Sequence, residues 1–242
     1  MDESAPRYAV YFAPREACVH DRVGSRWLGR DARNGGALAQ PAVTGVDPQR
    51  LRALTAHARR YGLHATLKPP FRLNAADDLP RLDAALRELA SAQTAFDFTV
   101  GLVPLDSFLA WQALDQQAQI DAIAARCVIE LDAFRRPASD AELARRRQAR
   151  LTPRQEELQQ QRGYPYVLDQ YRFHITLSDR LEGDEAALMA AALAHECREL
   201  VKAPLRFDAL GLFVQPNEDA DFRHVRRYGF DGSVRSIADW PA

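Results

Sequence analysis

The chain has 242 residues, and 47% of them are hydrophobic, which suffices to bury one substantial core or two smaller ones. Its 32 basic and 33 acidic residues nearly cancel, so the charge suggests neither a nucleic-acid coat protein nor a membrane-surface protein. There is no membrane-spanning apolar run, no signal-peptide pattern and no metal-type spacing of the three cysteines, which together predict a cytoplasmic protein with reduced thiols.

The first half of the chain predicts alternating strands and helices. Asp47 and Pro48 are typical of a helix start, and Gly62 is typical of a helix end. Short apolar runs bounded by Pro or Gly indicate strands. In chain order we predict a strand at 8–13, a helix at 47–61, a strand at 63–73, a helix at 78–92 and strands at 96–103 and 108–114.

Residues 19–36, between the first strand and the first of these helices, contain four glycines and four arginines. Backbone N–H groups and guanidinium groups in such a segment can bind phosphate. The segment matches neither a P-loop nor a dinucleotide-binding fingerprint. It therefore has two interpretations, a phosphate contact or a surface loop around a short helix.

The second half predicts a similar succession of elements. In chain order we predict a helix at 116–134, a strand at 173–181, a helix at 184–202 and a strand pair at 205–215 and 222–230. Between the first two lies an arginine-rich segment, residues 135–165, in which we expect a polar helical hairpin. That segment has three interpretations: a solvated arm, a basic lid over an anionic substrate, or a partner-binding arm.

Two similar halves predict a bilobal α+β fold of antiparallel strands and helices. We expect one domain over residues 1–242, with a first lobe at about 1–115 and a second lobe made of 116–134 and 166–242. Residues 135–165 would be an insertion between them. The active site would lie in the groove between two pseudo-symmetric lobes. The oligomeric state is not readable from the sequence.

A four-residue motif occurs once in each half. His64-Ala65-Thr66-Leu67 and His174-Ile175-Thr176-Leu177 both lie in predicted strands. Because side chains alternate along a strand, each His and the Thr two residues later project from the same face. Each half therefore offers one imidazole and one hydroxyl together, backed by aliphatic residues that can pack.

Two imidazoles suit displacement at a phosphodiester. One can take a proton from the nucleophile while the other protonates the departing oxygen, since histidine titrates near neutrality. The hydroxyls of Thr66 and Thr176 can donate to the phosphoryl oxygens. We expect His64 and His174 to be the catalytic acid and base, with their order left open.

The paired motifs resemble those of the 2H phosphoesterase superfamily, which is named for its two histidines. The flanking residues 62–71 and 163–166 resemble more narrowly its DUF1045-like branch, which is associated with bacterial phosphonate-utilisation operons. The resemblance implies a cyclic phosphodiesterase, and a ribose cyclic phosphate from carbon–phosphorus bond breakdown is the substrate that it suggests.

Alternation of side chains along the strands indicates further candidates for substrate binding. Lys68 lies two residues after Thr66, and Arg172 lies two before His174, so both could share the catalytic face. Tyr11 could place its hydroxyl in the groove or merely pack, and Tyr228 could reach the groove from the last strand or decorate an edge. No cluster of further His, Asp or Glu accompanies either motif, so we expect neither a metal nor another cofactor.

The sequence therefore predicts a metal-independent phosphoesterase that acts on a small phosphate ester. One alternative is an RNA or nucleotide 2′,3′-cyclic phosphodiesterase, in which the arginine-rich segment would contact RNA. Another is a non-catalytic protein of the same fold that binds a phosphate ligand.

Overall fold

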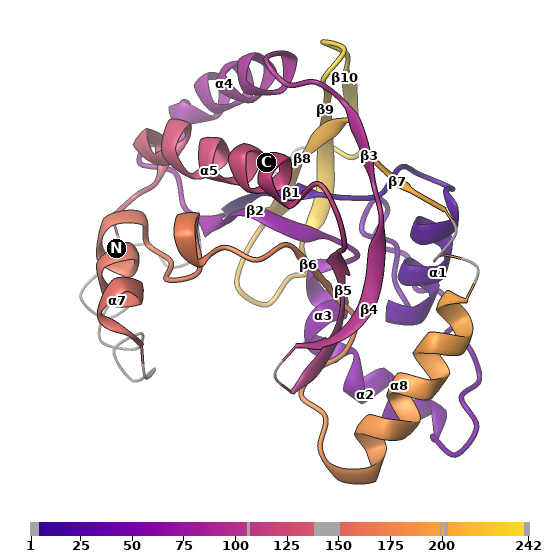
Figure 1. The fold of residues 1–242 in the computed structure, drawn as a ribbon. Coiled ribbons are helices and arrows are strands. Elements are labelled where there is room, and N and C mark those ends of the chain that lie inside the picture. Colours follow the sequence, from indigo (N-terminus) through magenta and orange to yellow (C-terminus); the bar gives the residue numbers. More distant parts are fainter. Residues whose placement is uncertain (1–4, 106, 138–150, 199, 201–202, 240–242) are drawn as a thin grey trace.

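A computed structural model describes residues 5–105, 107–137, 151–198, 200 and 203–239 (Figure 1). The strands are β1 (Arg7–Phe12), β2 (Ala65–Phe71), β3 (Phe96–Phe98), β4 (Val100–Leu105), β5 (Phe108–Ala113), β6 (His174–Thr176), β7 (Leu205–Phe207), β8 (Ala209–Gln215), β9 (Arg223–Gly229) and β10 (Val234–Ser236). The helices are α1 (Val19–Leu28), α2 (Pro48–Leu54), α3 (Ala56–Tyr61), α4 (Leu79–Ser91), α5 (Gln117–Glu130), α7 (Pro153–Arg162) and α8 (Gly183–Cys197), with 3-10 turns at Ala76–Asp78, Asp132–Phe134 and Leu168–Gln170. None of the helices in these ranges combines the length and the apolarity needed to cross a membrane.

The strands form one eight-stranded antiparallel sheet in the order β10-β9-β8-β1-β2-β6-β5-β4, together with a separate pair, β3 and β7. The predicted α+β class with antiparallel strands is thus confirmed. The strand order interleaves the two halves of the sequence, because the late strands β8 to β10 extend from β1, while the early strand β5 pairs with β6 and β4 pairs with β5 at the edge. The predicted lobes, 1–115 and 116–134 with 166–242, stay a prediction, and a groove between two lobes is not shown.

The large helices cover one face of this sheet. α5 packs against β2, and α4 packs against β9 (Figure 1). On this face Ala65 and Ile175, both fully buried, belong to the main hydrophobic core. A second, smaller cluster contains Tyr11, Phe213 and Phe222. The aliphatic residues of the motifs thus face the main core, and the opposite side of their strands is left to the polar motif residues.

The helix ends follow from local sequence. The carboxylate of Asp47 accepts hydrogen bonds from the first backbone N–H groups of α2, and Pro48 occupies its first turn. Gly29 and Gly163 end α1 and α7 in the left-handed conformation, at φ 77° and 76°. The single helix predicted over 47–61 is two helices, because Thr55 interrupts it with φ −116° and ψ 4°.

Helix α1 is fastened to the second motif by a buried tryptophan. The indole Nε1–H of Trp27 donates to the backbone oxygen of Leu177 at 2.8 Å. Just beyond, the carboxylate of Asp179 accepts from the backbone N–H of His57 at 3.0 Å, at the start of α3. The end of β6 is therefore held from two helices of the first half of the chain.

We expect Trp27→Phe to lower the free energy of unfolding by about 1–3 kcal/mol, because it leaves the buried Leu177 carbonyl without its donor. Urea denaturation monitored by circular dichroism measures this. Trp111→Phe is the matched control, since it removes the same ring volume but only a weak N–H···S contact to Cys197 at 3.3 Å. Equal losses in the two variants would show that the hydrogen bond to Leu177 does not contribute.

Candidate functional site

The two motifs meet because their strands are neighbours in the sheet. Ala65 of β2 pairs with Ile175 of β6 in antiparallel register. This register sets His64 opposite Thr176 and Thr66 opposite His174. Since Ala65 and Ile175 face the main core, the four polar side chains project together from the other face, where all four are half-buried. The structure thus brings together the four residues that the sequence predicts as catalytic.

Each imidazole is held by a backbone carbonyl two residues earlier. Nδ1 of His64 lies 2.9 Å from the oxygen of Gly62, and Nδ1 of His174 lies 2.8 Å from the oxygen of Arg172. A carbonyl can only accept, so Nδ1 carries the proton and Nε2 of the neutral ring keeps its lone pair. The Nε2 atom of His64 lies 3.5 Å from the hydroxyl of Thr66. Both rings therefore present the same reactive nitrogen.

Gly62 is required for this arrangement. Its φ is 79°, and a Cβ at this position would lie 2.4 Å from the Cβ of Ala32. A side chain here would have to move the backbone whose carbonyl orients His64. The glycine that the sequence indicates as a helix end thus also positions a motif histidine.

Burial makes both imidazoles weak bases. It lowers the pKa of His64 to about 4. The hydrogen bond to the carbonyl of Gly62 raises this pKa, and repulsion from the nearby His174 lowers it further. Burial also lowers the pKa of His174. Both rings are therefore neutral near pH 7 in the free protein, and an anion bound beside them would favour the imidazolium form.

Aromatic rings form one side of the site. Tyr11 of β1 pairs with Thr66, and its ring centroid lies 4.0 Å from that of His64. Tyr61 stacks on His64 at 5.7 Å and on Phe222 at 4.9 Å. The hydroxyl of Tyr11 is buried and has no hydrogen-bond partner among the described residues. The sequence offers Tyr11 as a candidate, whereas Tyr61 and Phe222 lie in patterns that indicate only packing.

Lys68 does not lie on the face of the motif histidines, so the prediction from strand alternation is wrong for this residue. Tyr11 pairs with Thr66, but its neighbour Val10 pairs with Lys68, so β2 contains a bulge between Thr66 and Lys68. A bulge inserts one residue and reverses the alternation after it. The amine of Lys68 accordingly points away from the histidines, 3.2 Å from the Val128 carbonyl of α5 and 3.5 Å from Asp132.

Tyr228 is displaced from the motif face in the same way. Phe213 pairs with His224 while Leu212 pairs with Arg226, which makes Val225 the extra residue of a bulge in β9. Tyr228 therefore faces the main core, where its hydroxyl donates to Asp83 of α4 at 2.7 Å. His224 stays on the other side, with its ring stacked on Phe213 at 4.5 Å.

Arg172 contacts the motif residues through its backbone and not through its side chain. Its carbonyl orients His174, and its side chain is exposed. The side chain lines a shallow depression beside Gln112, the residue that pairs with His174 on β5. Arg172 therefore remains a candidate for contact with a substrate that extends along this edge.

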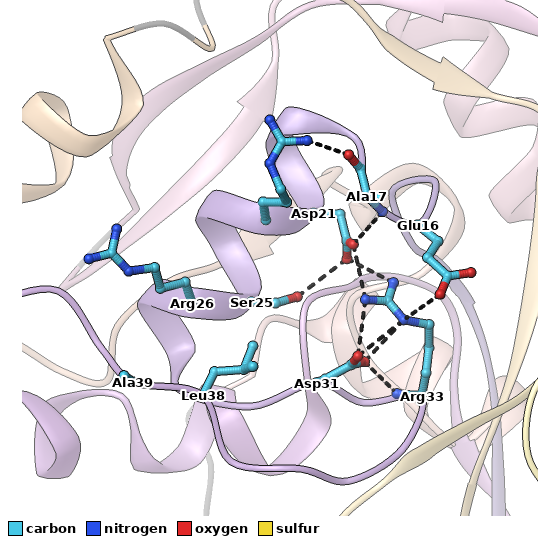
Figure 2. A pocket seen from close by; sticks show the side chains of 10 residues that line it. Glu16, Ala17, Asp21, Ser25, Arg26, Asp31, Arg33, Leu38 and Ala39 are labelled. Carbon is cyan, nitrogen blue, oxygen red and sulfur yellow. Dashed lines mark hydrogen bonds and ion pairs between the residues drawn. The ribbon is translucent and has the colours of Figure 1, made fainter.

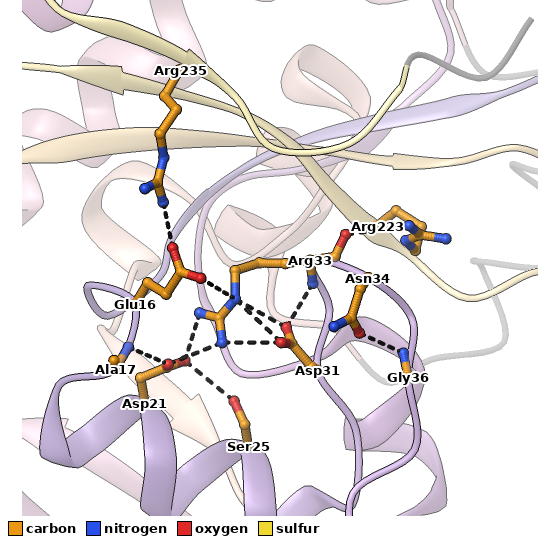
Figure 3. Close-up of polar contacts among 10 residues, drawn as sticks. All are labelled: Glu16, Ala17, Asp21, Ser25, Asp31, Arg33, Asn34, Gly36, Arg223 and Arg235. Carbon is orange, nitrogen blue, oxygen red and sulfur yellow. Dashed lines mark hydrogen bonds and ion pairs between the residues drawn. The ribbon is translucent and has the colours of Figure 1, made fainter.

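The glycine- and arginine-rich segment 19–36 forms α1 and a loop folded against it. Figure 2 shows the depression that they line, and Figure 3 shows its polar contacts. The guanidinium of Arg33 donates to Asp21 at 2.9 and 3.0 Å and to Asp31 at 3.1 Å. Arg30 is buried and donates to the Phe222 carbonyl at 2.7 Å. These contacts favour the interpretation as a structural loop, since carboxylates and carbonyls occupy the guanidinium groups that a phosphate would need.

Of the arginine-rich segment 135–165, residues 138–150 lie outside the described residues. The remainder includes α7, and three of its arginines, Arg135, Arg154 and Arg162, form ion pairs. Arg135 and Arg162 both contact Asp132, at 2.8 and 3.3 Å, and Arg154 contacts Asp169 at 2.6 Å. These described arginines therefore offer no unpaired charge to RNA.

A metal site would need several ligating side chains close together. In the described part of the chain, no three His, Cys, Asp or Glu side chains gather as a metal site would need. The histidine pair thus lacks a third protein ligand among these residues.

Comparisons with known proteins place the chain among several relatives. A family model described as "Protein of unknown function (DUF1045)" matches residues 66–223. The chain is 39% identical over 235 residues to "Ribose 1,5-bisphosphate phosphokinase PhnN" of Janthinobacterium sp. (strain Marseille), which covers 95% of the chain and 52% of that protein. It is 36% identical over 222 residues to the protein of the same name from Laribacter hongkongensis (strain HLHK9), covering 91% and 51%. The chain thus spans about half the length of these curated relatives. Among solved structures, Usb1 of Kluyveromyces marxianus matches with a TM-score of 0.40 at 10% identity, covering 97% of this chain and 98% of that one.

We expect Asp132→Ala to lower the free energy of unfolding by about 2–4 kcal/mol, because the amine of Lys68, only 2% exposed, then loses its carboxylate. Burial already lowers the pKa of Lys68 to about 8, and Asp132 opposes that shift. Lys68→Met added to Asp132→Ala should recover much of the loss, since it removes the buried charge. Chemical denaturation of the two variants tests this, and a double variant no more stable than Asp132→Ala would contradict it.

Proposed function

The chain belongs to the DUF1045 family, and on this premise we propose that it is a metal-independent phosphoesterase in which two histidines transfer protons at a cyclic phosphate or small phosphodiester. The family match confirms the resemblance to the DUF1045-like branch. The reaction itself is an inference from the geometry of the motif residues.

The pairing of Ala65 with Ile175 carries this proposal. It supports a site in which His64 and His174 lie on one face with equivalent hydrogen bonds at Nδ1 and equivalent lone pairs at Nε2. Such a pair can flank one phosphoryl group and reach its attacking and departing oxygens. Thr66 and Thr176 are placed to donate to the non-bridging oxygens, where charge grows.

The mechanism needs one neutral and one protonated imidazole. The neutral ring takes a proton from water as the water oxygen bonds to phosphorus, and the imidazolium gives its proton to the alkoxide as the P–O ester bond breaks. The two rings have then exchanged protonation states. Because burial makes both rings neutral in the free protein, the anionic substrate favours uptake of the required proton.

The relatives suggest the class of substrate. Their name describes a phosphokinase whose substrate is ribose 1,5-bisphosphate. Hydrolysis of a 1,2-cyclic phosphate of ribose 5-phosphate, with water oxygen added to phosphorus and the bond to O2 broken, yields that compound. We therefore propose a ribose cyclic phosphate as substrate. Its hydrolysis would produce the compound on which the relatives act according to their name.

We expect His64→Ala and His174→Ala each to reduce turnover of a ribose cyclic phosphate by about two to four orders of magnitude, as loss of a general acid or base does. The assay uses purified protein, a panel of cyclic phosphates and excess EDTA. His195→Ala is the control, because His195 is exposed on α8. A folded motif variant that keeps more than about a tenth of the activity would exclude that histidine from proton transfer, and loss of wild-type activity in EDTA would exclude the metal-free mechanism.

We expect kcat/KM to rise as the pH falls from about 8 to about 6, approaching tenfold per pH unit. In this range the singly protonated free protein is the scarce form, since burial lowers the pKa of both histidines. A cyclic diester without a monoester group is the substrate of choice, because it does not titrate in this range. A kcat/KM independent of pH over this interval would mean that no proton is taken up for catalysis.

A further inference from the structure

Two arginines beside the motif face are held by neutral groups. The Nε of Arg7 donates to the side-chain oxygen of Gln215 at 2.6 Å. The Nε of Arg60 lies 3.4 Å from the carbonyl of Ala220, which also accepts from the amide of Gln215 at 2.7 Å. Both arginines are half-buried, and their contacts meet at the loop 216–222 between β8 and β9.

Neither of these two guanidinium groups has an ion-pair partner among the described residues, although the same loop carries acidic residues. Glu218 of the loop contacts Arg72 at 2.9 Å, and Asp221 contacts Arg30 at 3.2 Å. One Nη atom of Arg60 is buried without a hydrogen-bond partner. A buried polar atom of this kind is costly unless a ligand satisfies it.

Phe222 links these cations to the motif histidine. The guanidinium carbon of Arg7 lies 5.6 Å from the centre of the Phe222 ring, and the backbone N–H of Phe222 donates to the carbonyl of Arg60 at 2.9 Å. Tyr61 and Tyr11 also neighbour that ring, and both contact His64. One aromatic ring, that of Phe222, therefore lies between Arg7 and the tyrosines at His64.

We propose that Arg7 and Arg60 form a second anion subsite, which binds a phosphate monoester at the far end of the substrate. Guanidinium groups fixed by neutral acceptors keep their remaining N–H donors and their full charge for phosphate oxygens. The proposal rests on the proposed function, because it places the cyclic phosphate at the histidines. The substrate class is then narrower: a pentose cyclic phosphate that carries a second phosphate.

A pair of substrates tests the subsite. Ribose 1,2-cyclic phosphate and its 5-phosphorylated form differ only in the group that Arg7 and Arg60 would bind. We expect wild-type kcat/KM to favour the phosphorylated form, and Arg7→Gln or Arg60→Gln to reduce that preference by about 10- to 100-fold. Arg7→Lys, which keeps the charge, should retain part of it. Arg126→Gln is the control, since Arg126 is an exposed arginine paired with Glu130 on α5.

A binding measurement separates the subsite from the reaction. Ribose 5-phosphate has no cyclic diester to open, so its affinity, measured by calorimetry, depends on the subsite and not on turnover. Weaker binding to Arg7→Gln than to wild type and Arg126→Gln would support the subsite even if no cyclic phosphate were hydrolysed, in which case the proposed function fails alone. Hydrolysis without preference for the phosphorylated form, together with equal binding of ribose 5-phosphate to all variants, would overturn the subsite and leave the proposed function standing.

Discussion

The pairing of β2 with β6 at Ala65 and Ile175 determines what the rest of the structure can do. Because both residues face the main core, the histidines and threonines on either side of them face outward together. Burying the aliphatic half of each motif thus also fixes the direction of its polar half. The same burial limits hydration of the imidazoles, which is why their pKa values lie below the ordinary range.

The antiparallel α+β class, and the shared face of each motif histidine with the threonine two residues later, could be predicted from the sequence, because side chains alternate along a strand. Lys68 and Tyr228 could not be placed, since one inserted residue in β2 and another in β9 reverse that alternation. A bulge is set by register with neighbouring strands, which a single sequence does not display. The positions of these two residues therefore depended on tertiary pairing.

The pairing of strands from the two halves could not be predicted for a different reason. Similar successions of strands and helices in the two halves indicate repetition, but they do not state which strands pair. In the structure β1 lies between β2 and β8, so the first strand joins elements from both halves. Arg7 and Arg60 could not be singled out from the sequence either, because what distinguishes them is that no described carboxylate forms an ion pair with them. That property depends on where Glu218 and Asp221 are directed.

The position of β1 also bears on how the chain folds during synthesis. Tyr8 and Ala9 pair with Val214 and Phe213, so one edge of the first strand has no native partner until β8 has left the ribosome. Contacts so distant in sequence slow folding, and an unpaired strand edge is prone to association with other chains. Without β8, the strand β1 that pairs with the motif strand β2 would keep one edge unpaired, so completion of the sheet depends on the late strands.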